Sequence, residues 1–187
     1  MQWNKHYDLS RKHALLGASQ NSWLNYDQDR VRQIYESSKR KELGTELHAF
    51  ASQAIKHRIK LGRLKKSVNQ FVNDAIGFNM ESEKVLYYSD VAFGTADAIC
   101  FRDGVLRIHD LKTGDIPVKK FNQLDIYAAL FCLEYDVDPT KIEIVQRLYQ
   151  ANRIKENNPD PYRIADIMDK IVRFSAILIQ LQDEEGE

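Results

Sequence analysis

The sequence predicts an α/β fold in which a small mixed sheet is flanked by helices, all within one domain of residues 1–187. Apolar residues recur at helical spacing through residues 1–78, whereas runs of β-branched and aromatic residues begin near residue 80. A chain of this length can bury one sizeable core. We therefore expect an N-terminal helical section, residues 1–78, followed by a mixed-sheet core, residues 79–187.

Three helices are expected in the helical section. The first is capped by Ser19 or Asn21, because these side chains can accept hydrogen bonds from the free N–H groups of a first turn. The second spans Thr45–Leu61 and the third spans Leu64–Ile76, each with an apolar stripe at helical spacing. A glycine follows each of these two helices, as expected of a helix end.

Three strands should follow. Glu83–Tyr88, Val91–Phe101 and Val105–Thr113 are rich in β-branched and aromatic residues. The second and third of these segments are separated by Arg102-Asp103-Gly104, whose Asp-Gly pair is typical of a tight turn. A hairpin is therefore expected between them.

The remaining chain alternates between helix and strand. A helix is expected over Phe121–Glu134, a strand over Lys141–Tyr149, and a long last helix after Pro159 and Pro161. The order of elements is thus three helices, three strands, a helix, a strand and a helix. This order is that of a mixed sheet flanked by helices.

The composition excludes several classes of protein. No segment approaches about 18 consecutive apolar residues, so a transmembrane helix is excluded and no membrane partner is expected. The N-terminal residues are polar and lack the apolar centre of a secretory signal. Cys100 and Cys132 are too few for a disulfide framework or for a metal site built from thiolates alone. These features predict a cytoplasmic protein.

The formal net charge of zero conceals an asymmetry. Residues 1–80 hold 14 Lys/Arg and 7 Asp/Glu, whereas residues 81–187 hold 13 and 20. The positive part includes a basic run made of Lys56, Arg58, Lys60, Arg63, Lys65 and Lys66. Such a run can neutralise nucleic-acid phosphates, although taken alone it is better explained as a solvated helix face. Composition therefore permits a nucleic-acid partner without requiring one.

Three charged residues have a spacing that indicates a metal centre. Asp97 precedes Asp110-Leu111-Lys112 by thirteen residues. Alternate residues of a strand share a face, so Asp110 and Lys112 should point to one side and Leu111 to the core. Buried charges are costly unless they are paired or bound to a metal. Asp97, on the adjacent strand, can bring a second carboxylate close to Asp110.

Two adjacent carboxylates repel each other, and a hard divalent cation, Mg²⁺ or Mn²⁺, relieves that repulsion. A water on the cation can attack a phosphodiester, and Lys112 beside it can orient that water or stabilise the developing charge. Each residue alone is more often structural: Asp97 and Asp110 as turn or edge-strand carboxylates, Lys112 as a surface lysine. Their expected convergence on one spot favours the metal centre.

The same residues resemble the signature of the PD-(D/E)XK nuclease superfamily, and the flanking motifs resemble its RecB-like branch. That branch has a histidine in a G-x-x-x-H context on an upstream helix, which Gly44-Thr45-Glu46-Leu47-His48 matches. It also has a Q-x-x-x-Y motif on the helix after the lysine strand, which Gln123 and Tyr127 match. The resemblance covers residues 44–127, with four motifs in the family's order.

The resemblance implies a restriction-endonuclease-like core and a role for each matching residue. The metal ligands would be His48, Asp97, Asp110 and the backbone carbonyl of Leu111. Lys112 would assist catalysis, and Gln123 and Tyr127 would support it and contact DNA near the scissile phosphate. Taken alone, His48 would be a helix-surface or core histidine, and the Gln-Tyr pair a capping glutamine and a core tyrosine. Glu83 is expected to contribute a hydrogen bond to a ligand.

Two features of such relatives are missing. The chain has too few cysteines for the iron–sulfur cluster of some RecB-like nucleases, and no G-x-x-x-x-G-K-[ST] loop of a helicase. The chain looks like the stand-alone phage and prophage exonucleases that process linear duplex DNA for recombination. This implies DNA as a partner, a single-strand-annealing protein as a further one, and a homo-oligomer. Two alternatives remain open: an endonuclease selective for structure or sequence, and a binding module that does not cleave.

Overall fold

The computed structural model describes residue 16, residues 21–114 and residues 117–185. Contacts along the chain divide it into two compact units, Met1–Leu43 and Gly44–Glu187. The second unit contains the whole sheet and the helices that pack on it. In the described part of the chain, no helix combines the length and the apolar character needed to cross a lipid bilayer.

The first helices begin and end at positions that differ from the prediction. A short 3-10 helix, η2 (Asn21–Asn25), precedes α1 (Gln28–Lys56). The Asp27 carboxylate accepts a backbone hydrogen bond of 2.7 Å in the first turn of α1, so Asp27 is the residue that caps this helix. The cap predicted at Asn21 is therefore wrong, and Ser19 lies outside the described residues.

α1 runs without a break through Gly44, so the two helices predicted in this region are one. A single interior glycine costs a helix only about 1 kcal/mol, which the packed turns that follow it offset. The predicted end at Leu61 is also wrong. Arg58 adopts a left-handed φ of 56°, and the Ile59 N–H donates to the Ala54 carbonyl at 2.9 Å, which closes a Schellman-type cap.

The early end of α1 changes the surroundings of the basic run. Only Lys56 is helical, and the other members lie in the loop that leads to α2 (Ser67–Gly77). All six side chains are exposed. The basic run is therefore a solvated loop, and the interpretation as a helix face is wrong.

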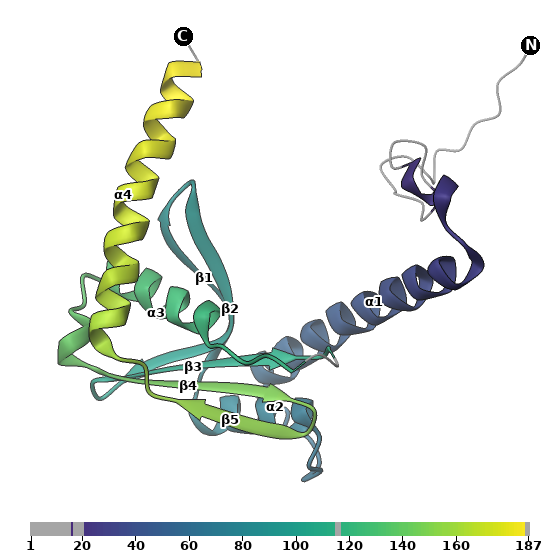
Figure 1. Cartoon of the computed structure of the whole chain (residues 1–187). Coiled ribbons are helices and arrows are strands. Elements are labelled where there is room, and N and C mark those ends of the chain that lie inside the picture. Colours follow the sequence, from purple (N-terminus) through teal and green to yellow (C-terminus); the bar gives the residue numbers. More distant parts are fainter. Residues whose placement is uncertain (1–15, 17–20, 115–116, 186–187) are drawn as a thin grey trace, which may run out of the picture. The chain divides into compact units, whose positions relative to one another are not determined.

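Five strands form one mixed sheet in the order β1-β2-β3-β4-β5 (Figure 1). They are β1 (Glu81–Ser89), β2 (Ala92–Arg102), β3 (Val105–Lys112), β4 (Glu143–Gln150) and β5 (Arg153–Asn157). Neighbouring strands are antiparallel except for β3 and β4, which are parallel. The predicted α/β class, with a mixed sheet flanked by helices, is confirmed.

Tight turns connect two pairs of strands. Asp103 and Gly104, between β2 and β3, have φ values of 52° and 75°, as the Asp-Gly signal predicts for a hairpin. Ala151 and Asn152 make a similar turn between β4 and β5, with φ values of 49° and 60°. β5 was not predicted, because an Ala-Asn pair lacks the glycine that normally marks such a turn.

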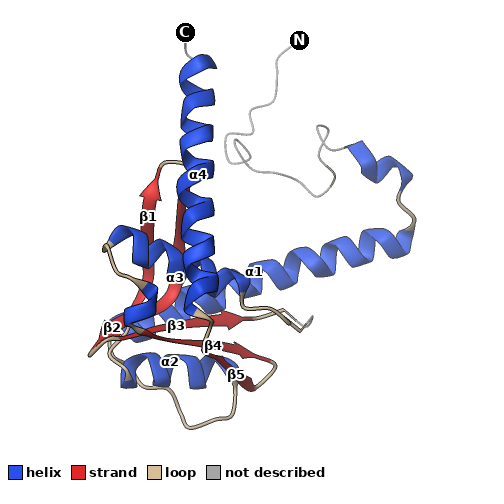
Figure 2. Cartoon of the chain, turned by 60° about the vertical axis from the view of Figure 1, so that its left-hand side comes forward, coloured by secondary structure: helices blue, strands red, loops and turns tan. Residues whose placement is uncertain are grey.

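Helices cover both faces of the sheet (Figure 2). α3 (Asn122–Glu134) and α4 (Pro161–Glu185) lie on one face and α2 lies on the other, while η3 (Pro139–Lys141) leads into β4. Side chains of β3 alternate between the two layers: Ile108 packs with α3, whereas Leu111 packs with α2. Since alternate residues share a face, Asp110 and Lys112 lie on the α3 side at the end of β3.

Candidate metal centre

Three side chains from three elements form a group that could hold a metal ion. They are His48 of α1, Glu83 of β1 and Asp97 of β2, and one ligand atom from each lies within 4.8 Å of the others. The Nδ1 atom of His48 is 3.4 Å from Oδ2 of Asp97. One imidazole nitrogen and two carboxylates are a suitable set for Mn²⁺ or Mg²⁺.

The pairing of the strands brings a third carboxylate to this place. β1 and β2 pair at Ser82–Ala98 and Lys84–Ala96, so the same register puts Glu83 opposite Asp97. β2 and β3 pair from Ala98–His109, and one further step puts Asp97 opposite Asp110. Glu83, Asp97 and Asp110 thus occupy matching positions on three neighbouring strands.

The backbone departs from regular geometry at this place. Glu83 has a φ of 51°, which is unusual for a non-glycine residue within a β-strand. The Asp97 carboxylate accepts a hydrogen bond of 2.8 Å from the Leu111 N–H, so it occupies a position where β2 would otherwise pair with β3. Irregular strand geometry of this kind is concentrated at functional sites.

α1 reaches the sheet closely enough to present His48. A Cβ atom on Gly44 would lie only 2.7 Å from Oγ1 of Thr113, directly after β3, so a glycine permits this approach. Further along α1, the buried hydroxyl of Ser52 contacts that of Ser82 in β1 at 3.1 Å. His48 lies between these two contacts and is half-buried.

Asp110 is more deeply buried than the three residues of this group. Its side chain is 1% exposed, and its Oδ2 atom has no hydrogen-bond partner among the described residues. The Nζ atom of Lys112 lies 3.1 Å from its other oxygen, Oδ1. A buried carboxylate oxygen without a partner is costly. A cation bound beside Asp97 would supply the missing partner.

The carboxylates at this place have too few positively charged neighbours to keep their pKa values at the ordinary level. Burial and the nearby Asp97 raise the pKa of Asp110, although Lys112 opposes this. Burial and Asp97 also raise the pKa of Glu83. The hydrogen bond and charge of Asp97 raise the pKa of His48 against the effect of burial. A divalent cation would favour the ionised carboxylates and the neutral imidazole.

A chain of hydrogen bonds holds Lys112 from the α3 side. Its ammonium donates to Oε1 of Gln123 at 2.7 Å, and the Gln123 amide donates to the Tyr127 hydroxyl at 2.9 Å. Gln123 and Tyr127 are four residues apart on α3, so they share one helix face. The ammonium is thereby fixed between Asp110 and α3.

Gly94 of β2 makes room for Tyr127. A Cβ atom there would lie 2.9 Å from Cε1 of the Tyr127 ring, which is only 9% exposed and cannot move freely. We expect Gly94→Ala to lower the free energy of unfolding by about 1–3 kcal/mol, as overpacking does in a filled core. Denaturant unfolding measures this, with Gly77→Ala as the control because no atom lies within 4 Å of its added Cβ. Equal stability of the two variants would contradict this description of the packing.

The structure thus brings together His48, Asp97, Asp110, Lys112, Gln123 and Tyr127, all of which the motifs indicate. Leu111 is held in the same place through its N–H. Within the basic run, the Lys56 charge lies close enough to lower the pKa of Glu83 against the opposing effect of burial. Sequence reasoning expected a hydrogen bond from Glu83, and the structure adds that Glu83 belongs to the group that could hold a metal ion. Counting back from the β1–β2 turn would have placed Glu83 one residue away from Asp97, because the register shifts between Tyr87 and Ser89.

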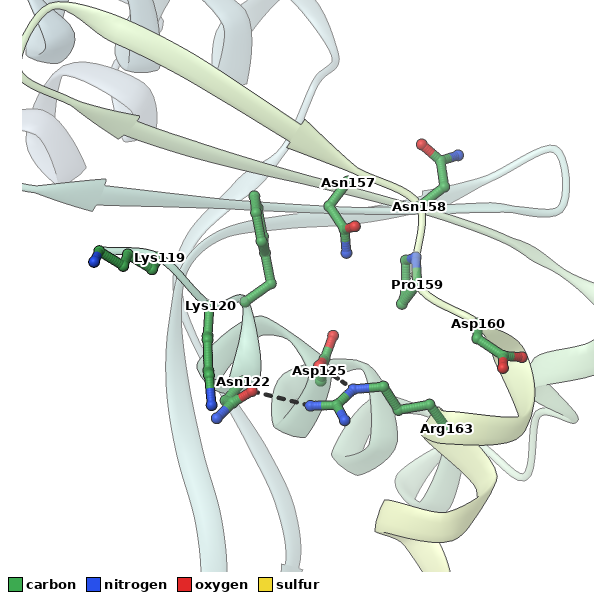
Figure 3. Close-up of a pocket in the computed structure, with 10 residues that line it drawn as sticks. Lys119, Lys120, Asn122, Asp125, Asn157, Asn158, Pro159, Asp160 and Arg163 are labelled. Carbon is green, nitrogen blue, oxygen red and sulfur yellow. Dashed lines mark hydrogen bonds and ion pairs between the residues drawn. The ribbon is translucent and has the colours of Figure 1, made fainter. Parts of the chain in front are cut away.

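A separate cavity of about 390 Å³ opens beside the first turn of α3 (Figure 3). Asp125, 3% exposed, lies at this cavity and accepts hydrogen bonds from Gln146 and from Arg163 at 2.9 and 2.8 Å. Arg163 also donates to Asn122, as the dashed lines in Figure 3 show. The buried carboxylate of Asp125 is therefore paired, in contrast to that of Asp110.

Comparisons with known proteins give one family match, over less than half of the chain, and no activity. A family model described as "Protein of unknown function (DUF2800)" matches residues 81–157. Nothing in a comparison with curated proteins matches the chain. Among solved structures, the chain is similar to one titled "Crystal structure of SSO0001", with 15% sequence identity and a TM-score of 0.38. That match covers 81% of this chain and 67% of the other. The segment matched by the family model includes Glu83, Asp97 and Asp110 but not His48.

Proposed function

We propose that this protein is a Mg²⁺- or Mn²⁺-dependent deoxyribonuclease that hydrolyses phosphodiester bonds, acting as an exonuclease on linear DNA in recombination or repair. The observation that carries the proposal is the buried carboxylate of Asp110, which lies beside Asp97 and Lys112 and whose Oδ2 has no hydrogen-bond partner within the described part of the chain. The order of the sequence motifs, from Gly44 to Tyr127, supports the same assignment.

The donor set fits a hard divalent cation. The donor atoms are carboxylate oxygens of Asp110, Asp97 and Glu83 and an imidazole nitrogen of His48. Among the described residues, the group that could hold a metal contains no cysteine, whose thiolate would favour a softer metal. When bound, such an ion supplies Lewis acidity and an activated water. Glu83 thereby becomes a ligand in the proposal, in place of the minor role expected from sequence.

The residues on the α3 side have a different task. The Lys112 ammonium is held between Asp110 and Gln123, where it can stabilise negative charge that develops on a phosphoryl oxygen. Tyr127 fixes Gln123, so it acts on Lys112 indirectly as a positioning residue. Fixed geometry of this kind is effective because the donor need not reorganise during the reaction.

The first experiment compares two DNA substrates. The purified full chain is incubated with Mg²⁺ or Mn²⁺ and either a linear duplex or a covalently closed circle. We expect the linear duplex to be digested, the circle to survive, and chelation by EDTA to stop the reaction. Cleavage of the circle would replace the exonuclease with an endonuclease. No cleavage of either substrate with either metal would contradict the nuclease proposal.

The basic run is proposed to bind DNA phosphates. Since each lost phosphate contact reduces the slope of log K against log salt by about 0.9, Lys60→Gln with Lys65→Gln should reduce it by about 2. Binding of a labelled duplex is measured across a salt series in an Asp110→Asn background, which prevents digestion. Arg102→Gln with Lys141→Gln is the control, because both residues lie near the start of β3, at the opposite end from Lys112. An unchanged slope in the first variant would show that the run does not contact DNA.

A further inference from the structure

The C-terminal half of α4 carries apolar side chains that the rest of its unit does not cover. Figures 1 and 2 both show this half of the helix continuing past α3 and beyond the tip of the β1–β2 hairpin. Ile164, near the start of the helix, is fully buried, and Ile167 and Ile171 are half-buried against the core around α3. From there on the apolar side chains of this row are exposed, Phe174 by 53%, Leu178 by 46% and Leu181 by 49%, whereas Ser175 is buried and accepts a hydrogen bond from Ser89 of β1.

These apolar residues follow the spacing of a helix–helix seam. Positions 164, 167, 171, 174, 178 and 181 are separated by alternating steps of three and four residues. This heptad spacing keeps one stripe facing a neighbouring helix along the whole length. In the first half of α4 the stripe faces the core of its own unit, and in the second half it faces solvent. The second half therefore carries a helix–helix stripe that no described residue covers.

A groove runs beside this stripe. A cavity of about 440 Å³ is lined by apolar side chains of α4, by Ile126 of α3 and by Val91 at the hairpin tip. Lys170 lies at the same groove and has no ion pair with any other described residue. Glu184 lies two heptads later at the same heptad position, and its only contact with another described residue is a hydrogen bond from Gln180 on the same helix.

We propose that α4 pairs in antiparallel orientation with α4 of a second copy of this chain. In that arrangement Phe174 packs against Leu178 of the partner subunit, and Ile171 packs against Leu181 of the partner subunit. Lys170 then lies near Glu184 of the partner subunit, and the two-fold axis repeats this pair on the other side. In a parallel pair Lys170 would instead lie beside Ser175 of the partner subunit, so the lysine and the glutamate would not meet. Charges flanking a seam decide orientation in this way.

The charge pattern thus selects a second copy as the occupant of the seam. The seam covers only the last turns of α4, so the interface is small and belongs to the weak class. We therefore expect a dimer that dissociates on dilution. This inference does not depend on the proposed nuclease activity, because none of the residues named here belongs to the candidate metal centre.

Sedimentation velocity of the full chain, from about 1 to 100 µM, tests the pairing. The expected result is a species of twice the chain mass of 21.8 kDa that dissociates on dilution. Leu178→Glu should remain monomeric throughout the range with unchanged thermal unfolding. Ile179→Glu is the matched control: it changes an equally apolar residue, 41% exposed, that lies outside the seam, and it should still dimerise.

The orientation has its own test. Lys170→Glu should weaken the dimer by about tenfold, and Lys170→Glu combined with Glu184→Lys should restore it, since the exchanged charges attract again across the antiparallel pair. A wild-type chain that is monomeric at 100 µM, or a Leu178→Glu variant that still dimerises, would overturn the proposal. Failure of the charge exchange to restore pairing would overturn the antiparallel arrangement.

Discussion

Asp110→Asn is expected to reduce metal-dependent digestion of linear DNA by about 1000-fold or more, because one of the three carboxylates proposed to bind the ion is lost. The same change should leave the metal-free protein as stable as before or make it more stable. Asp110 is buried and its pKa is raised, so its ionised form is better tolerated in the unfolded chain than in the folded one. Asparagine has the same shape without that charge. Digestion assays and urea unfolding measure the two effects.

The sign of the stability effect follows from linkage. Because the folded-state pKa of Asp110 is raised, the metal-free wild type loses stability as the pH rises through the unfolded value and on to the folded one. The penalty is fully present above both values, at neutral pH. Asp110→Asn removes it, so the difference between variant and wild type should shrink when the pH is lowered. A variant that is less stable than wild type at pH 7 would contradict this account of Asp110.

Asp125→Asn is the matched control for Asp110→Asn. Both aspartates are almost fully buried, but Asp125 is paired with Arg163 and Gln146 (Figure 3). Its replacement should lower the free energy of unfolding by about 1–2 kcal/mol, since a charged hydrogen bond is weakened and Arg163 is half exposed. Digestion by the folded variant should be unchanged. The two buried aspartates are thus expected to give opposite results in the two assays.

Lys112→Met is expected to reduce the rate of digestion by about 100- to 1000-fold, as the loss of a single preorganised donor does in other enzymes. Metal binding should survive, because the carboxylates and His48 remain. The variant therefore distinguishes metal binding from catalysis. We expect it to bind the ion but to leave the charge that develops on the phosphoryl group without stabilisation. Digestion rates at saturating DNA and metal measure the effect.

Lys141→Met serves as the control for Lys112→Met. Lys141 also lies beside an aspartate, Asp138, at 3.4 Å, but it is exposed and leads into β4 at the other end of the sheet. No change in digestion is expected. A Lys112→Met variant that digests DNA as fast as Lys141→Met would remove Lys112 from the proposed mechanism.

The parts of the fold that sequence could predict are those that local chemistry decides. The Asp103-Gly104 turn has its own signal, and the strands on each side of it follow directly. The strand alternation around Leu111 correctly placed this residue in the core, because the period of a strand is two. The Gln123–Tyr127 pair lies on one face of α3 because the helical period brings together residues four apart.

Other features depend on contacts that a single segment does not reveal. Gly44 indicates a helix end by its own propensity, yet α1 continues through it, since the lack of a side chain allows close contact with Thr113. β5 follows a turn with positive φ angles but no glycine. The part played by Glu83 depends on hairpin register, which places it opposite Asp97 only once β1 and β2 have paired. In each case a distant strand or helix determines the outcome.

The most direct test of the metal centre is a calorimetric titration of the full chain with Mn²⁺ at neutral pH. We expect saturable binding in the wild type and its loss in Asp97→Asn and Asp110→Asn, with binding retained in Asp125→Asn. Heats that are absent from the wild type, or that persist unchanged when Asp97 and Asp110 are replaced, would mean that these carboxylates do not converge on an ion.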